Sequence, residues 1–397
     1  MDYFYKQPKY YSQFRCIGGD CPESCCDGWC VLWTSQEIDN LKSADVSAGL
    51  KERIDNSFSY TEEHKKYMIN LCNDGRCPFH NRETDLCDIQ HELGEKALST
   101  VCGTYPRNYI ENHNYLIRWC STSCPAVIDL LFKDERATEI ENIIARNYNK
   151  LNRAAIILDS ASVIKDDPIK KKRIELFDFY TRILLNDTRS IETSIILTAL
   201  AVKHLTTAEE KKDFESMGKI IHDLELQLNN PATTKSVDEI KPNYQLKFKL
   251  VNNMVIKFFS ERPGIGNLFS SIHDGNELIV DKYLTGLEKF NMAFDNKDYI
   301  LKNIIMNTFY DMNMPIGKLK RSLFENYAYF VLAVASIKTV AAAVGFSCKN
   351  IKDDFKICVS EMSRNYSHDI HKADAIAEDI KQMGLTSPAH LALIIKG

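Results

Sequence analysis

The sequence predicts a mainly α-helical protein in which a cysteine-rich N-terminal module, held together by metal and containing short β-hairpins, precedes a multi-helix bundle or array. Eleven of the 13 cysteines lie between Cys16 and Cys124. From Pro125 onward, apolar residues recur almost without a break at three- and four-residue spacing, which is typical of helices. We therefore expect residues 1–124 to form the cysteine-rich module and residues 125–397 to form an all-helical domain.

The composition is that of an ordinary soluble protein, with 44% hydrophobic and 26% charged residues. A net charge of −4 provides no general basic field, so we expect no nucleic-acid partner. The N-terminus lacks the charged and apolar regions of a secretory signal, which favours a cytoplasmic protein. In a reducing cytosol, dense cysteines indicate metal binding or catalysis more often than a disulfide scaffold.

The first cysteine group is too dense to be explained by core packing. Five thiols occur within fifteen residues, at Cys16, Cys21, Cys25, Cys26 and Cys30. The adjacent Cys25 and Cys26 could bridge each other only with strain, because a disulfide needs a specific Cα separation and torsion. The odd total of 13 cysteines also argues against complete pairing. Metal binding is therefore favoured over a disulfide framework.

Local signals predict short elements in this first third. Thr34 followed by Glu37 forms a capping box, which predicts a helix beginning at Ser35. The polar segment 45–66 is expected to hold a helix and a connection. Turn residues at 73–75 and at 81–85 predict a small hairpin over residues 76–87.

The end of the module is expected to lead directly into the helical part. Residues 89–99 fit a helix, and two apolar-aromatic runs around residues 111–114 predict a second hairpin that delivers Cys120. Pro125 suits the first position of the next helix.

The remaining sequence predicts roughly eight to ten helices. Helical periodicity is clearest in seven segments, which are 126–148, 174–185, 191–205, 214–228, 244–259, 299–312 and 351–366. Residues 327–346 are apolar and about long enough to span a bilayer. Lys338 lies inside this run and its alanines suit close packing, so we expect a buried central helix.

The cysteine spacing favours an iron-sulfur site, with zinc as the alternative. Soft thiolate ligands bind iron-sulfur clusters, zinc or Cu(I). The spacings C-x4-C-x3-C-C and C-x4-C-x9-C, followed by a lone Cys102, differ from the paired knuckles of zinc ribbons. The thiols could serve one metal site or two. His80 and His91 are either additional ligands or ordinary hydrogen-bonded histidines.

Familiar cofactor motifs are absent from the sequence. It contains neither the GxGxxG of dinucleotide-binding folds nor a GxxxxGK[ST] phosphate loop. The C-x3-C-x2-C triplet of radical S-adenosylmethionine enzymes is also missing, because Gly28 occupies its third position.

Four separated motifs, in order, resemble the CxxCxxCC family of zinc- or iron-chelating proteins, and within it the flagellin lysine N-methylases. They are Phe14-Arg15-Cys16, the C-x3-C-C-x-G-W core from Cys21 to Trp29, the segment CPFHNRETDLCDIQHELGEKALSTVCGTYPR over residues 77–107, and Ser123-Cys124-Pro125. The motifs cover about residues 10–130 of this chain. The length and layout of the whole chain are also similar to those of the family.

The resemblance implies an enzyme that transfers methyl groups from S-adenosylmethionine to lysine side chains of flagellin in the bacterial cytosol. It also implies a cysteine-bound [4Fe-4S] cluster and membrane-associated homo-oligomers. Carried over by position, the metal ligands would be Cys16, Cys21, Cys25, Cys26, Cys77, Cys87 and Cys102. Cys30 and Cys72 fall outside the family's pattern.

Two residues are candidates for binding the cofactor. Arg107 could bind the carboxylate of S-adenosylmethionine, or it could brace the metal loop. Trp29 could stack on the cofactor, or it could shield the cluster. Polar methyl transfer needs a neutral lysine amine, whose ordinary pKa is near 10.4. The sequence leaves polar and radical transfer both open.

Two non-catalytic functions are consistent with the same residues. The N-terminal third could be a structural metal module attached to a helical scaffold that binds a partner. Alternatively, the protein could be a zinc or iron chaperone.

Overall fold

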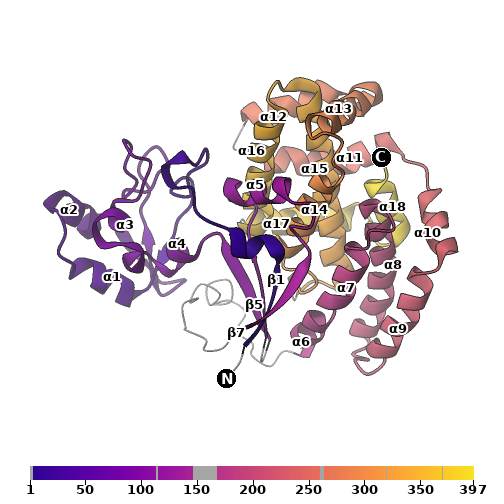
Figure 1. The fold of residues 1–397 in the computed structure, drawn as a ribbon, viewed down its shortest axis with the longest axis horizontal. Coiled ribbons are helices and arrows are strands. Elements are labelled where there is room, and N and C mark those ends of the chain that lie inside the picture. Colours follow the sequence, from indigo (N-terminus) through magenta and orange to yellow (C-terminus); the bar gives the residue numbers. More distant parts are fainter. Residues whose placement is uncertain (1–2, 113–114, 146–167, 260–262, 319, 369) are drawn as a thin grey trace. The chain divides into compact units, whose positions relative to one another are not determined.

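The computed structural model describes residues 3–112, 115–145, 168–259, 263–318, 320–368 and 370–397. The chain forms two compact units (Figure 1). Unit 1 comprises Met1–Val127 and Ile140–Val163, and unit 2 comprises Ile128–Glu139 and Ile164–Gly397. The described elements are mainly helical, which confirms the predicted class.

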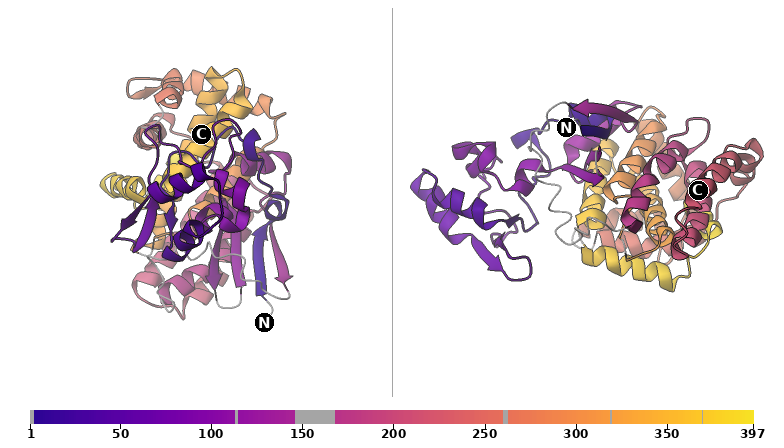
Figure 2. Two further views of the ribbon diagram at one scale, coloured as in Figure 1. Left: turned by 90° about the vertical axis from the view of Figure 1, so that its left-hand side faces the viewer. Right: turned by 90° about the horizontal axis from the view of Figure 1, so that it is seen from below.

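A four-stranded sheet in unit 1 joins the start of the chain to residues more than a hundred positions later. Its strand order is β5-β6-β1-β7, and Figure 2 shows the strands side by side. The strands are β1 (Tyr3–Pro8), β5 (Arg107–Asn112), β6 (Tyr115–Cys120) and β7 (Ile140–Ala145). The predicted second hairpin is confirmed, because β5 and β6 pair antiparallel. β1 lies parallel to β6 and antiparallel to β7.

The cysteine-rich part of unit 1 has a small core of its own. A three-stranded sheet of order β2-β4-β3 packs with short helices. The elements are β2 (Leu32–Trp33), α1 (Ser35–Lys42), α2 (Ala48–Asn56), β3 (Phe58–Thr61), β4 (Lys66–Ile69), α3 (Asp88–Leu93) and α4 (Thr100–Thr104). Three 3-10 turns, η1 (Lys9–Gln13), η2 (Gly18–Asp20) and η3 (Glu95–Ala97), complete unit 1. Buried Trp33, Leu50 and Phe79 are central to this core.

Several local predictions are confirmed or corrected in this part. The capping box of Thr34 and Glu37 begins α1. The helix expected over residues 89–99 ends at Leu93, because Gly94 adopts a positive φ of 81° that breaks the helix. Segment 45–66 holds α2 as expected, but much of its connection is strand β3. The hairpin expected over residues 76–87 is limited to an isolated bridge between His80 and Cys87.

The helix predicted over residues 126–148 is wrong beyond Lys133. α5 (Pro125–Lys133) begins at Pro125 as expected, and the chain then turns into strand β7. β7 pairs with all six residues of β1, so a partner far away in sequence overrides the local helical pattern. Residues 146–148 lie outside the described chain.

Unit 2 is built almost entirely of helices. They are α6 (Pro168–Glu175), α7 (Phe177–Leu184), α8 (Ile191–Glu210), α9 (Met217–Leu228), α10 (Pro231–Asp238), α11 (Tyr244–Phe258), α12 (Pro263–Phe269), η5 (Ser270–Ile272), α13 (Val280–Ala293), α14 (Tyr299–Asp311), α15 (Leu323–Ser347), α16 (Ile351–Ser363), the π-turn η6 (Arg364–His368), α17 (Ile370–Gln382) and α18 (Pro388–Ile395). A two-stranded hairpin, β8 (His273–Asp274) and β9 (Glu277–Leu278), interrupts them.

α15 is the central helix of unit 2. It packs against helices that include α8, α11, α13, α16 and α18, as Figure 1 shows. Within the described residues, α15 is the one helix long and apolar enough to cross a membrane, and 89% of its most apolar stretch is buried inside the protein. The expected buried central helix is therefore confirmed.

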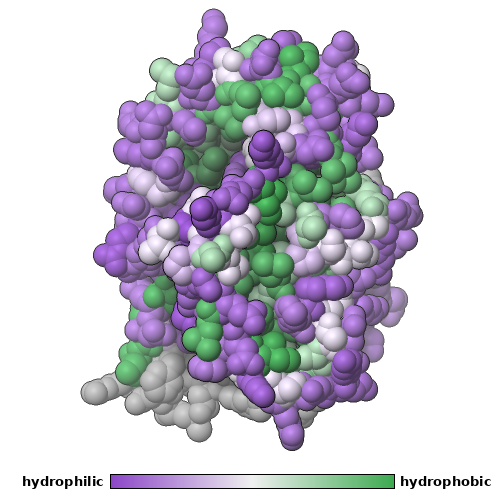
Figure 3. Space-filling view, turned by 90° about the vertical axis from the view of Figure 1, so that its right-hand side faces the viewer, coloured by the Kyte–Doolittle hydropathy of each residue, from purple (hydrophilic) through white to green (hydrophobic). Residues whose placement is uncertain are grey.

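The face of unit 2 that Figure 3 presents is mostly hydrophilic. Figure 3 shows hydrophilic side chains interrupted by bands of apolar ones. The large apolar side chains exposed on this unit include Leu226, Ile256, Leu284 and Met292. Exposed apolar residues are common on soluble proteins, so they indicate no particular partner.

Candidate metal and cofactor site

Backbone hydrogen bonds join the two cysteine groups. The N–H of Cys77 donates to the carbonyl oxygen of Cys26 at 2.8 Å, and the N–H of Gly28 donates to that of Gly75 at 3.0 Å. Between these bonds, Asp27 and Arg76 form an antiparallel bridge. The loop that carries Cys26 therefore lies directly against the loop that carries Cys77.

A tight turn brings Cys87 to the same place. The N–H of His80 donates to the carbonyl oxygen of Cys77 at 3.1 Å, and the N–H of Asn81 donates to that of Leu86 at 2.8 Å. The bridge between His80 and Cys87 closes this turn. Cys77 and Cys87 both pack, partly buried, against the core of the module.

Cys102 is positioned by the first turn of α4. The hydroxyl of Ser99 caps this helix by accepting a hydrogen bond from the N–H of Cys102 at 3.0 Å. The carboxylate of Glu37, in α1, accepts from both the N–H and the hydroxyl of Thr100, at 2.8 and 2.6 Å. Helix α1 therefore fixes the start of the helix that carries Cys102.

The thiols are close enough to influence one another electrostatically. A hydrogen bond with Cys25, burial and nearby thiols all raise the pKa of Cys26. Burial, with a contribution from neighbouring thiols, raises the pKa of Cys77 and that of Cys102 to about 12 each. The Cys87 thiol also has a raised pKa, chiefly because of burial.

These shared effects have a chemical consequence. The thiols of Cys25, Cys77 and Cys87 influence both Cys102 and Cys26. These five residues form one group, which we call the thiol cluster. Burial, together with repulsion between ionised neighbours, disfavours the thiolate forms of Cys26, Cys77, Cys87 and Cys102 when no cation is bound. A bound metal cation would remove that repulsion and allow several thiolates to form together.

Cys16 and Cys21 form local hydrogen bonds within their own loop. Cys16 is exposed, and its sulfur accepts a hydrogen bond from the N–H of Gly18 at 3.4 Å. The Cys21 thiol donates to the carbonyl oxygen of Glu23 at 3.1 Å. Burial raises the pKa of Cys21, and the neighbouring Cys25 and Cys16 contribute to the shift.

Cys124 is a further neighbour that the sequence did not single out as a ligand. It is buried immediately before α5. Burial, with contributions from the thiols of Cys21 and Cys25, raises its pKa to about 12. The Ser123-Cys124-Pro125 motif is the sequence signal that could have indicated it. Cys30 and Cys72, which fall outside the family pattern, are both exposed.

The ligands that the thiol cluster offers are all sulfur atoms, which suit a soft metal. Backbone bonds link the loops of the thiol cluster, and each of its members supplies sulfur. Among the described residues, however, no three cysteine, histidine, aspartate or glutamate side chains converge closely enough to hold one ion as they stand. Binding a metal would therefore require local movement of these side chains.

The two residues predicted to bind the cofactor lie in different surroundings. The Trp29 indole N–H donates to the carbonyl oxygen of Cys25 at 2.6 Å, and its ring lies 5.6 Å from that of Tyr105. Trp29 thus borders the thiol cluster. Arg107 begins β5, and its guanidinium lies 4.9 Å from the centre of the Phe14 ring.

Comparison with known families gives a match within unit 2. The family model described as FliB lysine N-methylase C-terminal domain matches residues 177–394. Two proteins named lysine-N-methylase are 24% identical to this chain: that of Salmonella choleraesuis strain SC-B67 over 257 residues, and that of Salmonella typhimurium strain LT2 over 259 residues. Each match covers 62% of this chain and 59% of the relative, so the chain spans less than two thirds of their length.

A third relative matches a shorter part of this chain. The flagellar biosynthetic protein FliU of Salmonella muenchen is 28% identical over 134 residues, which are 33% of this chain and 78% of that protein. No solved structure matches the chain. Because the family model covers more than half of the sequence, the chain belongs to the family of the FliB lysine N-methylase C-terminal domain.

Proposed function

We propose that this protein is a protein-lysine N-methyltransferase that acts on flagellin in the bacterial cytosol and takes the methyl group from S-adenosylmethionine. The observation that carries this proposal is the family match over residues 177–394. The names of two relatives support lysine methylation, and the name of the third supports a flagellar context. The N-terminal motifs, which resemble flagellin lysine N-methylases, favour flagellin as the substrate.

We further propose that the cysteines of unit 1 hold a [4Fe-4S] cluster, with zinc as the alternative metal. The ligands would come from the thiol cluster, and from Cys16 and Cys21 beside it. More thiols are available than the four that such a cluster needs. When bound, an iron-sulfur cluster supplies one-electron chemistry.

The chain's own residues would prepare and shield this site. The hydrogen bonds between the loops of Cys26 and Cys77 hold the thiols near one another before any metal binds. The Trp29 ring, fixed by its bond to Cys25, would cover one side of the thiols with apolar surface. Shielding of this kind excludes water and controls the environment of a metal site.

In polar transfer, the lysine nitrogen forms the new bond to the methyl carbon as the sulfur-carbon bond of the donor breaks. The nitrogen must be neutral to attack, and it gives up a proton to solvent or to a base. Burial of the target side chain would lower its pKa toward neutrality. A role for Arg107 in binding the donor's carboxylate stays a prediction.

The experiment that tests this function is methyl transfer by the full chain. Anaerobically purified protein is mixed with labelled S-adenosylmethionine and flagellin, and labelled lysines are identified by mass spectrometry. We expect labelling that depends on both the protein and the methyl donor. Absence of labelling by protein with a fully loaded cluster would contradict the proposal and favour a non-catalytic metal-binding scaffold.

The identity of the metal is tested separately. Iron and acid-labile sulfide are measured on the same anaerobic preparation. We expect both in similar amounts, as an iron-sulfur cluster requires. Stoichiometric zinc without sulfide would exclude the cluster and leave a zinc site.

A further inference from the structure

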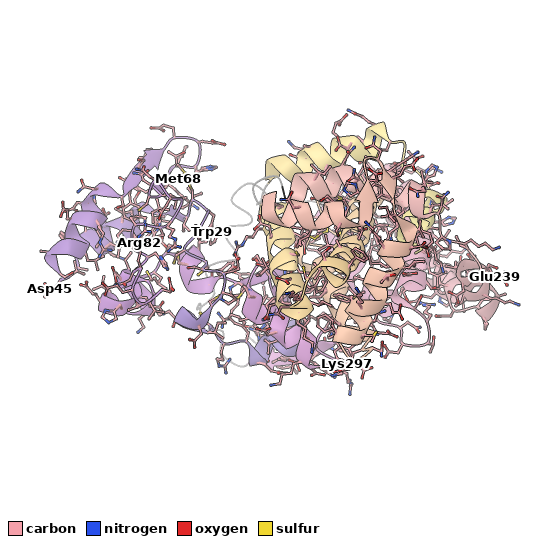
Figure 4. All side chains as sticks on the ribbon, turned by 90° about the horizontal axis from the view of Figure 1, so that it is seen from above. Trp29, Asp45, Met68, Arg82, Glu239 and Lys297 are labelled. Carbon is pink, nitrogen blue, oxygen red and sulfur yellow. The ribbon has the colours of Figure 1, made fainter. Side chains whose placement is uncertain are left out.

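A polar hollow of about 440 Å³ lies beside the thiol cluster in unit 1. Its lining includes Arg53, Cys77, His80, Arg82, Glu83 and Asp88. This volume lies within the range of roughly 300–1,000 Å³ that is typical of small-molecule sites. Figure 4 shows Arg82 and Trp29 on the same cysteine-rich part of the chain.

The hollow presents both positive and negative groups. Arg53 forms an ion pair with Asp88 at 2.7 Å, and it also donates to the carbonyl oxygen of Pro78. Arg82 pairs with Asp74 at 2.5 Å. A guanidinium has five N–H donors, so both arginines retain donors for a ligand. Among the described residues, the Glu83 carboxylate has no ion-pair partner.

His80 forms a closed part of the wall of the hollow. Its side chain is only 2% exposed, yet neither ring nitrogen has a hydrogen-bond partner within the described chain. The Nε2 atom lies 3.3 Å from a carboxylate oxygen of Asp85, but this contact lacks hydrogen-bond geometry. Both nitrogens are closed off from solvent, so they face the surrounding protein and leave ligand contacts to the charged side chains of the hollow.

We propose that this hollow binds an α-amino-acid group. Arg82 and Arg53 would receive its carboxylate, and Glu83 would receive its ammonium group. An anion alone would leave Glu83 facing it with like charge, and a cation alone would face two arginines, whereas a zwitterion matches both signs.

Two molecules could supply this group, namely S-adenosylmethionine through its methionine end, or a free amino acid. S-adenosylmethionine is the methyl donor of the proposed function, so this part of the inference rests on that function and assigns a binding place to the donor's amino-acid end. Cys77 belongs both to the wall of the hollow and to the thiol cluster. A donor whose amino-acid end binds here would therefore lie next to the thiols.

The test is a binding measurement that requires no turnover. Isothermal titration of the full chain uses three probes: S-adenosylhomocysteine, L-methionine and 5′-methylthioadenosine, which lacks the amino-acid group. The variants are Arg82→Gln and Glu83→Gln. Arg136→Gln is the matched control, because Arg136 forms a similarly exposed pair with Glu139 at 2.7 Å outside the hollow.

We expect S-adenosylhomocysteine to bind the wild-type protein and to bind both hollow variants about tenfold or more weakly. The control should bind like the wild type, and 5′-methylthioadenosine should bind weakly to every form. If L-methionine binds as tightly as S-adenosylhomocysteine and shows the same losses, a free amino acid is the source. Unchanged binding in both hollow variants, or no binding of any probe by the wild type, overturns the proposal.

Folding and function can be separated from this result. Arg82→Gln removes only an exposed ion pair, which contributes little to stability, and Glu83→Gln removes none. Thermal melting of both variants checks that they fold.

Arg107→Gln, measured in the same binding assay, tests whether Arg107 binds the carboxylate instead. If only that variant loses binding, Arg107 binds the carboxylate, and the proposal that the hollow binds it is overturned. If the wild type methylates lysine while the hollow variants bind normally, only the hollow proposal fails.

Discussion

At the residue scale, Cys26 has the most direct connections between the two cysteine groups. Its thiol is hydrogen-bonded to Cys25, and its carbonyl oxygen accepts the N–H of Cys77. We predict that Cys26→Ser lowers the metal content of anaerobically purified protein several-fold, because a hydroxyl is a poor ligand for a soft metal. The measurement is iron, zinc and sulfide per chain.

Cys348→Ser is the control for this prediction. Cys348 lies at the end of α15 in unit 2, far in sequence from the cysteine groups. Its substitution should leave the metal content unchanged. Equal metal content in the Cys26 and Cys348 variants would show that Cys26 is not a ligand.

The residues of the site were only partly predictable from the sequence. The spacing identified both cysteine groups, because clustered thiols are visible without any fold. The position of Cys124 near Cys21 depends on how the chain folds back, and spacing carries no such information. His80 was weighed as a ligand, but its unpartnered nitrogens became visible only with its surroundings.

At the scale of elements, α13 and α15 approach each other through glycines. A Cβ atom at Gly345 would overlap the carbonyl oxygen of Gly286, and one at Gly286 would overlap that of Ala342. We predict that Gly345→Ala destabilises the protein by about 1–3 kcal/mol, because the helices must move apart. Urea denaturation followed by circular dichroism measures this.

Gly218→Ala in α9 is the matched control, since no atom lies within 4 Å of the added methyl group. It should be neutral or stabilise by up to about 1 kcal/mol, because alanine favours helix. Equal effects of the two substitutions would contradict the close approach.

Glu37 connects α1 to α4, and this link should be sensitive to pH. Burial alone would raise the pKa of its carboxyl group, but hydrogen bonds from Thr100 and Thr34 outweigh burial and lower it. A lowered pKa in the folded state contributes stability above the unfolded pKa, near 4.3, and this contribution is lost as pH falls through the folded value.

We therefore predict that Glu37→Gln lowers the free energy of unfolding by about 1 kcal/mol at neutral pH. The difference from the wild type should shrink as pH falls below about 4. Urea denaturation across this pH range measures it. Glu63→Gln is the control, because Glu63 is exposed in the turn between β3 and β4. A constant difference at all pH values would contradict the role of the Glu37 charge.

Elements were predictable where their signals are local. The capping box that begins α1 and the first-turn proline of α5 were both visible in the sequence. β7 was not, because its isoleucines suit a helix or a strand equally, and its partner β1 lies more than 130 residues earlier. Its pairing depends on tertiary contact, which a single stretch of sequence does not encode.

At the scale of the whole molecule, the family match and the thiols lie in different units. Residues 177–394 belong to unit 2, whereas the thiol cluster belongs to unit 1. The two units also differ in how they are stabilised. Unit 2 buries a 25-residue helix among many others. The cysteine-rich part has a core of nine buried residues, which is small for independent stability.

This difference predicts the effect of metal removal on the full chain. A small core gains folding free energy from a bound metal, while a large helical core does not need one. After anaerobic chelation, we expect faster hydrogen exchange in residues 16–104 and unchanged protection of α15. Hydrogen exchange resolved by mass spectrometry measures both regions in one sample. Exchange that stays unchanged in residues 16–104, or that rises equally in α15, would show that metal does not specifically stabilise the cysteine-rich part.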